Sequence, residues 1–285
     1  MSGRICVITG ATSGIGRATA LALAALGFDL CLIGRTQTLG QRVAAACRAR
    51  NPGGRAEFLR ADLASQSDVR RAADAIMGRF RQVDVLVNNA GARNDRYDES
   101  PEGIEHTFAV NHLGHFLLTQ LLLEPLRRAH PGRVITVASV AHKGADLRHG
   151  WISAAPSYDR SVAYANSKLA NIVFARELAV RNDPAFVVSN AVDPGIVATR
   201  FARNNGLWSW LKHVLSSAAH RELVSARRGA DTVVYLAHSD ERPVATGRYV
   251  HRRAEIAPSA LAQDPELGRQ LWALSAKMTG LEPSV

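Results

Sequence analysis

Short runs of apolar, often β-branched residues recur along the chain, and longer segments of helical composition separate them. Three of these helical segments are residues 16–26, 36–50 and 229–237. The runs that predict strands are residues 5–8, 29–33, 56–59, 83–87, 134–137, 186–190 and 246–250. Nearly continuous apolar strands that alternate with helices are typical of a parallel sheet covered on both faces. We therefore predict a doubly wound α/β fold with about seven parallel strands.

The alternation breaks at residues 200–223, where Trp208 and Trp210 lie in an apolar stretch of helical spacing. A helix at this place suits a lid over a ligand, a contact with a membrane surface, or ordinary packing. We expect a substrate lid inserted within one domain, because no linker divides residues 1–285.

The composition supports one globular domain. The chain has 285 residues, of which 47% are hydrophobic and 21% charged, and this excludes a disordered or fibrous protein. No stretch approaches the ~18 to 20 apolar residues of a membrane span. The first apolar segment is too short for the core of a signal peptide. We expect a soluble, cytoplasmic protein without a membrane span.

The charge is strongly positive, with 31 Arg, four Lys and a formal net charge of +10. Nucleic acid, an anionic membrane surface or a polyanionic ligand would each suit such a charge, and so would plain solubility. The Arg residues are scattered without blocks or interleaved aromatic residues, which indicates no nucleic-acid partner. The oligomeric state stays open, a homo-oligomer included.

The three cysteines, Cys6, Cys31 and Cys47, fall in apolar or helical segments and form no CxxC pair. We expect buried thiols rather than a disulfide framework or a metal site.

A glycine-rich turn follows the first predicted strand and leads into a helix. Glycines at such a turn let the backbone approach a pyrophosphate, which the N–H groups of the helix then hold. A tight turn also uses glycine for steric reasons alone. The βαβ context favours a Rossmann-type dinucleotide site. The expected contacts are Gly10, Thr12, Ser13, Gly14, Ile15 and Gly16.

The end of the second predicted strand carries the signal for the cofactor's identity. An NAD site places a carboxylate there, whereas an NADP site adds Arg for the 2′-phosphate. This chain has Gly34 followed by Arg35, so we expect NADPH as the cofactor, unless Arg35 only caps a surface loop. Further cofactor contacts are expected at the ends of the next two strands, at Asp62, Leu63, Asn89, Ala90 and Gly91.

With these motifs and Tyr164-Ala-Asn-Ser-Lys168 downstream, the chain resembles the short-chain dehydrogenase/reductase family, of the single-domain type. The likeness runs along nearly the whole chain. Within the family the segments 110–118, 139–142, 167–171 and 270–275 are similar to the retinol dehydrogenase-like branch. Membrane-bound members of that branch carry an N-terminal hydrophobic anchor, which we do not expect here.

Carbonyl reduction by hydride needs a proton for the developing alkoxide. Tyr164 is the candidate acid, although an unperturbed phenol has a pKa of about 10. Lys168 stands four residues further on a predicted helix and shares its face, so we expect its ammonium to lower the pKa of Tyr164. A solvent-facing pair on a helix is the alternative.

The resemblance implies further roles. Ser139 would orient the substrate carbonyl, and Lys168 would also bind the nicotinamide ribose. Asn111 would hold a water that links Lys168 to solvent, and Thr199 would contact the carboxamide. Alone, Ser139 reads as a residue that ends a strand, and Asn111 as one that bonds the backbone.

Three histidines have simpler interpretations. His112 and His115 are three residues apart on a predicted helix, but two ligands without a third make a poor metal site, and we expect no metal. We expect His142 to be a packed or loop residue rather than a base.

The substrate pocket is expected to include Arg93, Trp151, Trp208 and Trp210. The tryptophans would supply flat apolar walls for a polycyclic or long lipophilic carbonyl. The branch continues its NNAG motif with apolar residues, whereas this chain has Ala92-Arg93-Asn94-Asp95. This difference favours a substrate with a polar or anionic group over a retinoid-like hydrocarbon.

The sequence therefore predicts an NADPH-dependent carbonyl reductase that also runs backward as an alcohol dehydrogenase. Its substrate would be a bulky ketone or aldehyde, such as a polyketide, another secondary-metabolite carbonyl or a retinoid-like carbonyl. The alternative is an NADP-sensing binding protein that keeps the fold without turnover.

Overall fold

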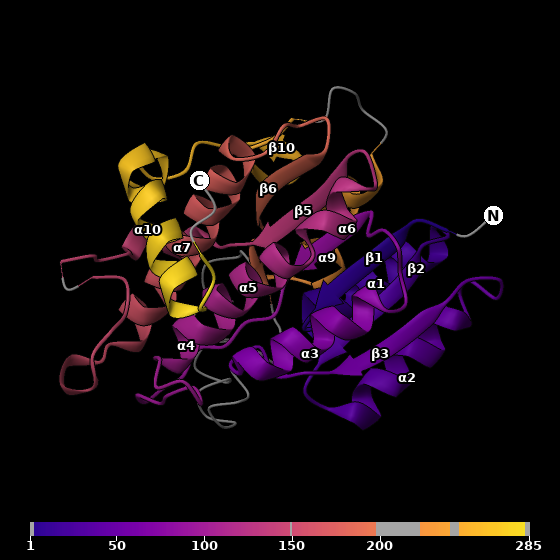
Figure 1. Cartoon of the computed structure of the whole chain (residues 1–285), viewed down its shortest axis with the longest axis horizontal. Coiled ribbons are helices and arrows are strands. Elements are labelled where there is room, and N and C mark those ends of the chain that lie inside the picture. Colours follow the sequence, from indigo (N-terminus) through magenta and orange to yellow (C-terminus); the bar gives the residue numbers. More distant parts are fainter. Residues whose placement is uncertain (1–2, 149, 198–222, 240–244, 283–285) are drawn as a thin grey trace.

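The chain folds around one twisted sheet. The computed structural model describes residues 3–148, 150–197, 223–239 and 245–282, and shows the sheet with helices on both faces (Figure 1). The strands of this sheet are β1 (Ile5–Thr9), β2 (Asp29–Gly34), β3 (Ala56–Arg60), β4 (Val85–Asn88), β5 (Gly132–Val137), β6 (Val187–Asp193), β9 (Tyr249–His251) and β10 (Ala254–Glu255). Their order across the sheet is β10-β9-β6-β5-β4-β1-β2-β3.

The seven strands from β9 to β3 are parallel, which confirms the predicted doubly wound sheet. Every residue of β2, β5 and β6 is buried. Strands covered on both faces need apolar side chains on both sides, and this explains the continuous apolar runs in the sequence.

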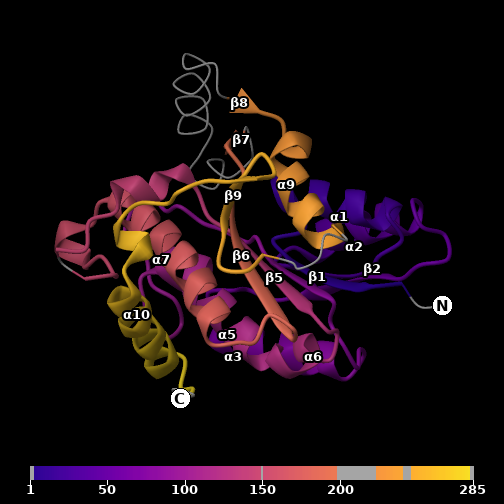
Figure 2. The ribbon, with the colours of Figure 1, turned by 90° about the horizontal axis from the view of Figure 1, so that it is seen from above.

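The helices form two layers, which Figure 2 shows on opposite sides of the sheet. One layer contains α1 (Gly14–Ala25), α2 (Gln37–Arg48) and α9 (Ala226–His238). The other contains α3 (Gln66–Met77), α5 (Gly114–Leu121), α6 (Leu123–Arg127), α7 (Arg160–Val180) and α10 (Pro265–Met278). Short helical segments join them, namely α4 (His106–Phe108), a π-helical turn (Ala109–Leu113), and three 3-10 turns (Val140–Gly144, Ala155–Ser157 and Leu261–Gln263).

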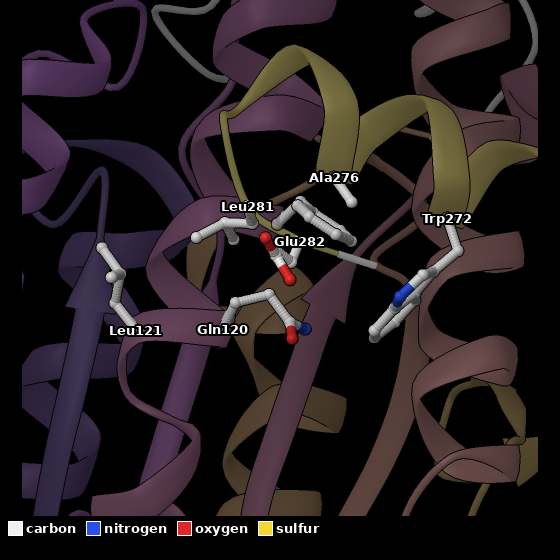
Figure 3. Close-up of a pocket in the computed structure, with 7 residues that line it drawn as sticks. Gln120, Leu121, Trp272, Ala276, Leu281 and Glu282 are labelled. Carbon is white, nitrogen blue, oxygen red and sulfur yellow. The ribbon is translucent and has the colours of Figure 1, made fainter. Parts of the chain in front are cut away.

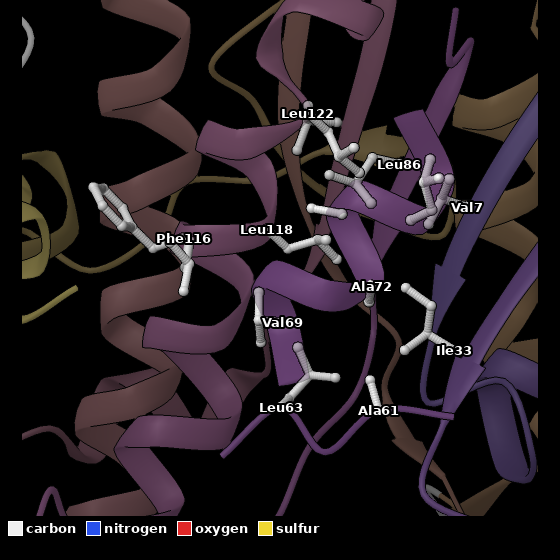
Figure 4. Close-up of a cluster of buried hydrophobic side chains, with 14 of the residues drawn as sticks. Val7, Ile33, Ala61, Leu63, Val69, Ala72, Leu86, Phe116, Leu118 and Leu122 are labelled. Carbon is white, nitrogen blue, oxygen red and sulfur yellow. The ribbon is translucent and has the colours of Figure 1, made fainter. Parts of the chain in front are cut away.

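A buried apolar cluster fills the space between the sheet and the second layer. Figure 4 shows Val7 and Leu86 on the strands facing Val69 of α3 and Leu118 of α5. A second cluster, on the opposite face, joins β1 and β2 to α1 and α2. Burial of apolar area on both faces stabilises the sheet by roughly 25 cal/mol per Å².

The structure differs from the sequence prediction at the margins of the sheet. β10 adds an eighth strand, and it is antiparallel because a tight turn at Arg252 and Arg253 returns the chain beside β9. Two further short strands, β7 (Ile196–Val197) and β8 (Leu223–Val224), pair with each other outside the main sheet. Residues 200–222 of the expected lid lie outside the described residues, so the lid stays a prediction.

The three cysteines, Cys6, Cys31 and Cys47, are free and buried, as predicted. Burial raises the pKa of Cys31 to about 12 and that of Cys47 to about 11, so both thiols stay protonated at neutral pH. Among the described helices, none is long and apolar enough to cross a membrane.

The strand order creates a crevice at one edge. β1 lies between β2 and β4, and the chain leaves β1 and β4 toward opposite sides of the sheet. Ligands of open parallel sheets bind outside the carboxyl ends of the strands at such a reversal. The loops that follow β1 and β4 are therefore the place for a candidate site.

Candidate active site

The loop after β1 requires its glycines. Gly10 and Gly14 have φ angles of +64° and +52°. A Cβ atom on Gly10 would lie 2.8 Å from the Cα of Ala90, and one on Gly16 would lie 2.5 Å from the side-chain amide nitrogen of Asn89. The loop thus packs its bare backbone against the loop after β4, at the start of α1. The N–H groups at a helix N-terminus of this kind can bind a pyrophosphate.

The rest of this loop is anchored to the sheet. Thr12 places its methyl group against Gly34, at the end of β2, where a Cβ would lie 3.0 Å from that methyl group. Ile15 packs against the apolar cluster of the first helix layer. Ser13 precedes α1 in an extended conformation and makes no side-chain capping bond within the described part of the chain. The first turn of α1 carries no acidic residue, which suits an anion there.

Thr9 ties the two loops together. Its hydroxyl accepts hydrogen bonds from the backbone N–H groups of Asn89, at 2.8 Å, and Ala90, at 2.9 Å. The side-chain amide of Asn89 donates in turn to the Thr9 carbonyl at 2.8 Å. Asn89 and Ala90 therefore lie where the sequence predicted, at the edge of the crevice, and Gly91 follows them.

His115 extends this network into the helix layer. Its Nδ1 lies 2.9 Å from the carbonyl oxygen of Asn111, and its Nε2 lies 2.9 Å from the Thr9 hydroxyl. Burial lowers the pKa of His115 to about 3, so the ring is neutral. Since a carbonyl only accepts, we assign the proton to Nδ1, and the Thr9 hydroxyl then donates to Nε2. This role of His115 was not predicted from the sequence.

Two arginines lie at the ends of neighbouring strands. Arg35 follows β2 and is exposed. Arg60, the last residue of β3, pairs in register with Gly34 and directs its Nε to the Arg35 carbonyl at 3.4 Å. Arg60 is not among the residues expected from the sequence, although its place at the end of a strand beside β2 was a usable signal.

Asp62 and Leu63 follow β3, as predicted. The Asp62 carboxylate accepts a hydrogen bond from the backbone N–H of Ala64 at 3.1 Å, which shapes the turn. Leu63 turns its side chain into the apolar core (Figure 4). A cofactor contact from Leu63 would therefore have to come from its backbone.

Asn111 lies in the middle of the π-helical turn, a feature that the sequence did not predict. Its Oδ1 accepts from the Ala92 N–H at 2.6 Å, and its Nδ2 donates to the Ala92 carbonyl at 2.9 Å and to the Ser167 hydroxyl at 2.9 Å. A π turn widens the helix locally and is frequent at functional sites. The expected water link between Asn111 and Lys168 is not tested here and stays a prediction.

Ser139, Tyr164 and Lys168 meet beyond the end of β5. Ser139 follows this strand, and its side chain lies near enough to the phenol of Tyr164, on α7, to oppose the rise of its pKa. Lys168 lies one turn further along α7, with its Nζ 5.6 Å from the centroid of the Tyr164 ring. The same Nζ donates to the carbonyl of Val137 at 3.0 Å, which fixes the buried ammonium at the strand end.

The two titratable groups have shifted pKa values. Burial raises the pKa of Tyr164 to about 12, and the Ser139 hydrogen bond and the charge of Arg93 oppose the rise. Burial lowers the pKa of Lys168 to about 8. We expected Lys168 to lower the pKa of Tyr164, but desolvation outweighs every favourable contact. The ammonium lies over the ring face and directs a proton to Val137.

The structure describes two of the four expected substrate residues. Arg93 lies beside Tyr164, with its Cζ 5.9 Å from the ring centroid. Trp151 is only 9% exposed and packs in a third apolar cluster with Leu169 and Val173 of α7. Its role as a pocket wall stays a prediction. Trp208, Trp210 and the cofactor residue Thr199 lie outside the described residues.

His112 and His142 also pack in the interior. His112 contacts the Ser275 hydroxyl at 2.8 Å, and burial lowers its pKa to about 3. His142 contacts the Ser139 carbonyl through Nδ1 at 2.8 Å, and its Nε2 accepts from the Ser259 N–H at 3.1 Å. This arrangement confirms His142 as a packed residue. Within the described ranges, no three His, Cys, Asp or Glu residues gather as metal ligands would.

A pocket of about 190 Å³ lies elsewhere, between α5 and α10 (Figure 3). Gln120 of α5 and Trp272 of α10 line it, and Leu281 and Glu282 close one side. None of its lining residues belongs to the candidate site.

Comparisons with known proteins find relatives along nearly the whole chain. The model of the short chain dehydrogenase family matches residues 4–210. The chain is similar to polyprenol dehydrogenase of Mus musculus, with 40% identity over 98% of this chain and 84% of that protein. It is also similar to retinol dehydrogenase 14 of Homo sapiens, with 36% identity over 99% of this chain and 88% of that protein.

Solved structures show the same fold. An uncharacterized protein from Mycobacterium paratuberculosis is 31% identical, with a TM-score of 0.75 over 100% of this chain and 96% of that chain. RhlG of Pseudomonas aeruginosa, solved as an NADP active-site complex, is 28% identical, with a TM-score of 0.69 over 88% of this chain and 95% of that chain.

Proposed function

Because the chain belongs to the short chain dehydrogenase family, in its retinol dehydrogenase-like branch, and is an oxidoreductase of carbonyls and alcohols, we propose that it is an NADPH-dependent reductase of bulky ketones and aldehydes. The same site would oxidise the product alcohol in the reverse direction. Polyketide-like, other secondary-metabolite and retinoid-like carbonyls are the candidate substrates. The names of two relatives refer to polyprenol and retinol, which supports a bulky substrate.

The residues at the crevice fit a dinucleotide. The glycines let the loop after β1 pack closely on Asn89 and Ala90, and the start of α1 offers N–H groups to a pyrophosphate. Arg35 and Arg60 add two positive charges at the ends of β2 and β3, where the ribose 2′-phosphate of NADPH would lie. The NADP complex of RhlG supports this choice of cofactor. When bound, NADPH supplies the hydride for the carbonyl carbon.

Tyr164 supplies the proton. With a pKa raised to about 12, its phenol is protonated at neutral pH and can give a proton to the carbonyl oxygen as charge develops there. The Ser139 hydroxyl, bonded to Tyr164, would share the same carbonyl oxygen. Lys168, with its ammonium over the face of the ring and anchored on the Val137 carbonyl, would bind the nicotinamide ribose, as the family resemblance implies. Thr199 is proposed to contact the carboxamide, as the family resemblance implies.

The observation that carries this proposal is the position of the Lys168 ammonium, which lies 5.6 Å from the centroid of the Tyr164 ring and donates to the Val137 carbonyl at 3.0 Å. Ser139 follows β5 and also acts on the phenol, so the three residues meet at one place. A protein that only sensed NADP would need the glycine-rich loop and Arg35, but not this acid pair.

The test follows NADPH oxidation by the purified protein with polycyclic ketones, aromatic aldehydes and retinoids. We expect Tyr164→Phe to lower turnover by roughly 10²- to 10⁴-fold while the Kd for NADPH changes less than about threefold. Tyr235→Phe, on α9, is the matched control and should keep full turnover. If Tyr164→Phe reduced every substrate as fast as the natural protein, the proposed mechanism would be wrong. Tight NADPH binding without any turnover would favour the sensor.

A further inference from the structure

Arg93 occupies a special position beside the candidate acid. It lies two residues after Gly91, in the loop that follows β4. Its Nη2 donates to the hydroxyl of Ser161 at 3.2 Å, and its Cζ lies 5.9 Å from the centroid of the Tyr164 ring. Ser161 and Tyr164 are three residues apart on α7, so Arg93 spans the face of the helix that carries the catalytic phenol.

Hydrogen bonds from Asn111 fix the backbone next to Arg93. Asn111 bonds both the N–H and the carbonyl of Ala92, the residue directly before it. The backbone at Arg93 is therefore tied to a buried amide, while its side chain is only half-buried. A side chain with a fixed backbone and a partly accessible guanidinium is suited to bind a ligand in one orientation, unlike a freely moving surface charge.

The acidic groups near Arg93 already serve other partners. One carboxylate oxygen of Asp159 accepts the N–H groups of Ser161 and Val162 at the start of α7. Asp95 pairs with Arg160 at 2.5 Å. Burial raises the pKa of Tyr164 and of Tyr158, and the charge of Arg93 opposes both rises. Backbone N–H groups lower the pKa of Asp159, and the charge of Arg93 adds to that effect. The guanidinium therefore acts on the phenol as well as on the start of α7.

We propose, on the basis of the proposed function, that Arg93 binds a carboxylate-type anionic group of the carbonyl substrate and so selects anionic ketones and aldehydes. A carbonyl oxygen that takes the proton of Tyr164 lies at hydrogen-bond distance from the phenol. The guanidinium beside that ring can then reach an anionic group on the same molecule. Guanidinium matches a carboxylate with two parallel N–H donors, which gives both affinity and orientation.

The test compares substrates that differ only in charge. Isothermal titration measures the Kd of meta- and para-formylbenzoate and of their methyl esters, with and without NADPH. We expect the natural protein to bind at least one of the two acids roughly 10- to 100-fold more tightly than its ester. Arg93→Gln should abolish this preference, and Arg93→Lys should keep a part of it, because a point charge remains without the fork.

Arg96→Gln is the matched control, since Arg96 is exposed in the same loop. We expect it to leave the preference unchanged. The proposal fails if the natural protein binds acid and ester equally, or if Arg93→Gln weakens both to the same extent.

A second readout separates this inference from the proposed function. Tyr164→Phe should retain the preference for the acid in binding while it loses turnover. If the natural protein shows the preference that depends on Arg93 but reduces neither aldehyde, Arg93 is an anion-binding residue and the proposed reduction is wrong. If the esters are reduced and no acid is preferred, the reductase stands and the role of Arg93 is refuted.

Discussion

The side chain of Asn111 pairs with the backbone of Ala92 as a neighbouring strand would, accepting from its N–H at 2.6 Å and donating to its carbonyl at 2.9 Å. The amide also donates to Ser167, on the helix that carries the candidate acid Tyr164. One fully buried residue therefore joins the loop after β4 to α7. This makes Asn111 a positioning residue for Arg93 and Tyr164 alike.

Asn111→Asp tests this arrangement. The variant keeps the shape of the side chain but places a carboxylate oxygen against the Ala92 carbonyl, where no proton lies between them. We expect the free energy of unfolding to fall by about 2–4 kcal/mol, measured by urea denaturation. Asn51→Asp, in the loop before β3, should change it by less than about 0.5 kcal/mol. Equal effects of the two variants would contradict the role of Asn111.

Thr9→Val tests whether the hydrogen bonds of the Thr9 hydroxyl stabilise the fold. The variant leaves the buried N–H groups of Asn89 and Ala90 without their acceptor, at a cost of about 1–3 kcal/mol each. It should also weaken NADPH binding, because the two loops lose their link. Thr19 is equally buried, and its hydroxyl has no hydrogen-bond partner among the described residues. Thr19→Val should therefore be neutral or stabilising in thermal unfolding.

Lys168→Met should gain stability while it loses activity. Burial lowers the pKa of Lys168 from 10.5 to about 8, so below that pH the folded protein carries a costly buried ammonium. Between about pH 8 and 10.5 the unfolded chain binds more protons than the folded one, and the stability of the natural protein rises with pH. The cost therefore disappears as the pH increases.

Met fills a similar volume, and the Val137 carbonyl keeps the amide of Asn171 as a donor at 3.1 Å. We expect Lys168→Met to be more stable by about 1–3 kcal/mol at pH 7, and by less at pH 9.5. Denaturant titrations at both pH values measure the difference. A loss of stability at pH 7 would mean that the ammonium contributes more through its contacts than it costs by burial.

Arg35→Asp should reverse the preference for the cofactor. A carboxylate at the end of β2 repels the 2′-phosphate of NADPH and accepts hydrogen bonds from the ribose of NADH. We expect the Kd for NADPH to rise at least about 100-fold and that for NADH to change little. Arg60→Gln should raise the Kd for NADPH less than Arg35→Asp does.

Arg50→Asp is the matched control for this experiment. Arg50 is exposed beyond the other end of α2, where it contacts the Ala46 carbonyl. Fluorescence titrations with both cofactors should not distinguish this variant from the natural protein. If Arg35→Asp weakened the binding of NADPH and of NADH equally, the proposal that Arg35 binds the 2′-phosphate would be wrong.

Much of the fold was predictable because it depends on local patterns. Strands buried on both faces must be apolar, so β1, β2 and β5 were visible as continuous runs. The antiparallel strand β10 was not visible in this way, because its two residues, Ala254 and Glu255, are exposed at the edge of the sheet and form no continuous apolar run. The positions of Gly10 and Gly16 were predictable because close backbone contacts tolerate no Cβ.

The environment of the candidate site depends on tertiary packing. The apolar character of Trp151 did not reveal that it packs with Leu169 and Val173 of α7. The direction of the pKa shift of Tyr164 depends on how completely neighbours exclude water, and no spacing along the chain reports this. The same holds for Arg60, which reaches the cofactor end only because β3 lies beside β2.

By itself, the sequence determined the parallel sheet, the glycine-rich loop, and the shared helix face of Tyr164 and Lys168, because these follow from periodicity and backbone sterics. Only the tertiary structure decided that Asn111 bonds Ala92, that His115 joins Thr9, and that Arg93 lies beside Tyr164. The reason is physical. Hydrogen bonds and charge contacts between segments far apart in the chain depend on how the strands and helices pack, and a buried polar group takes whichever partner that packing brings near.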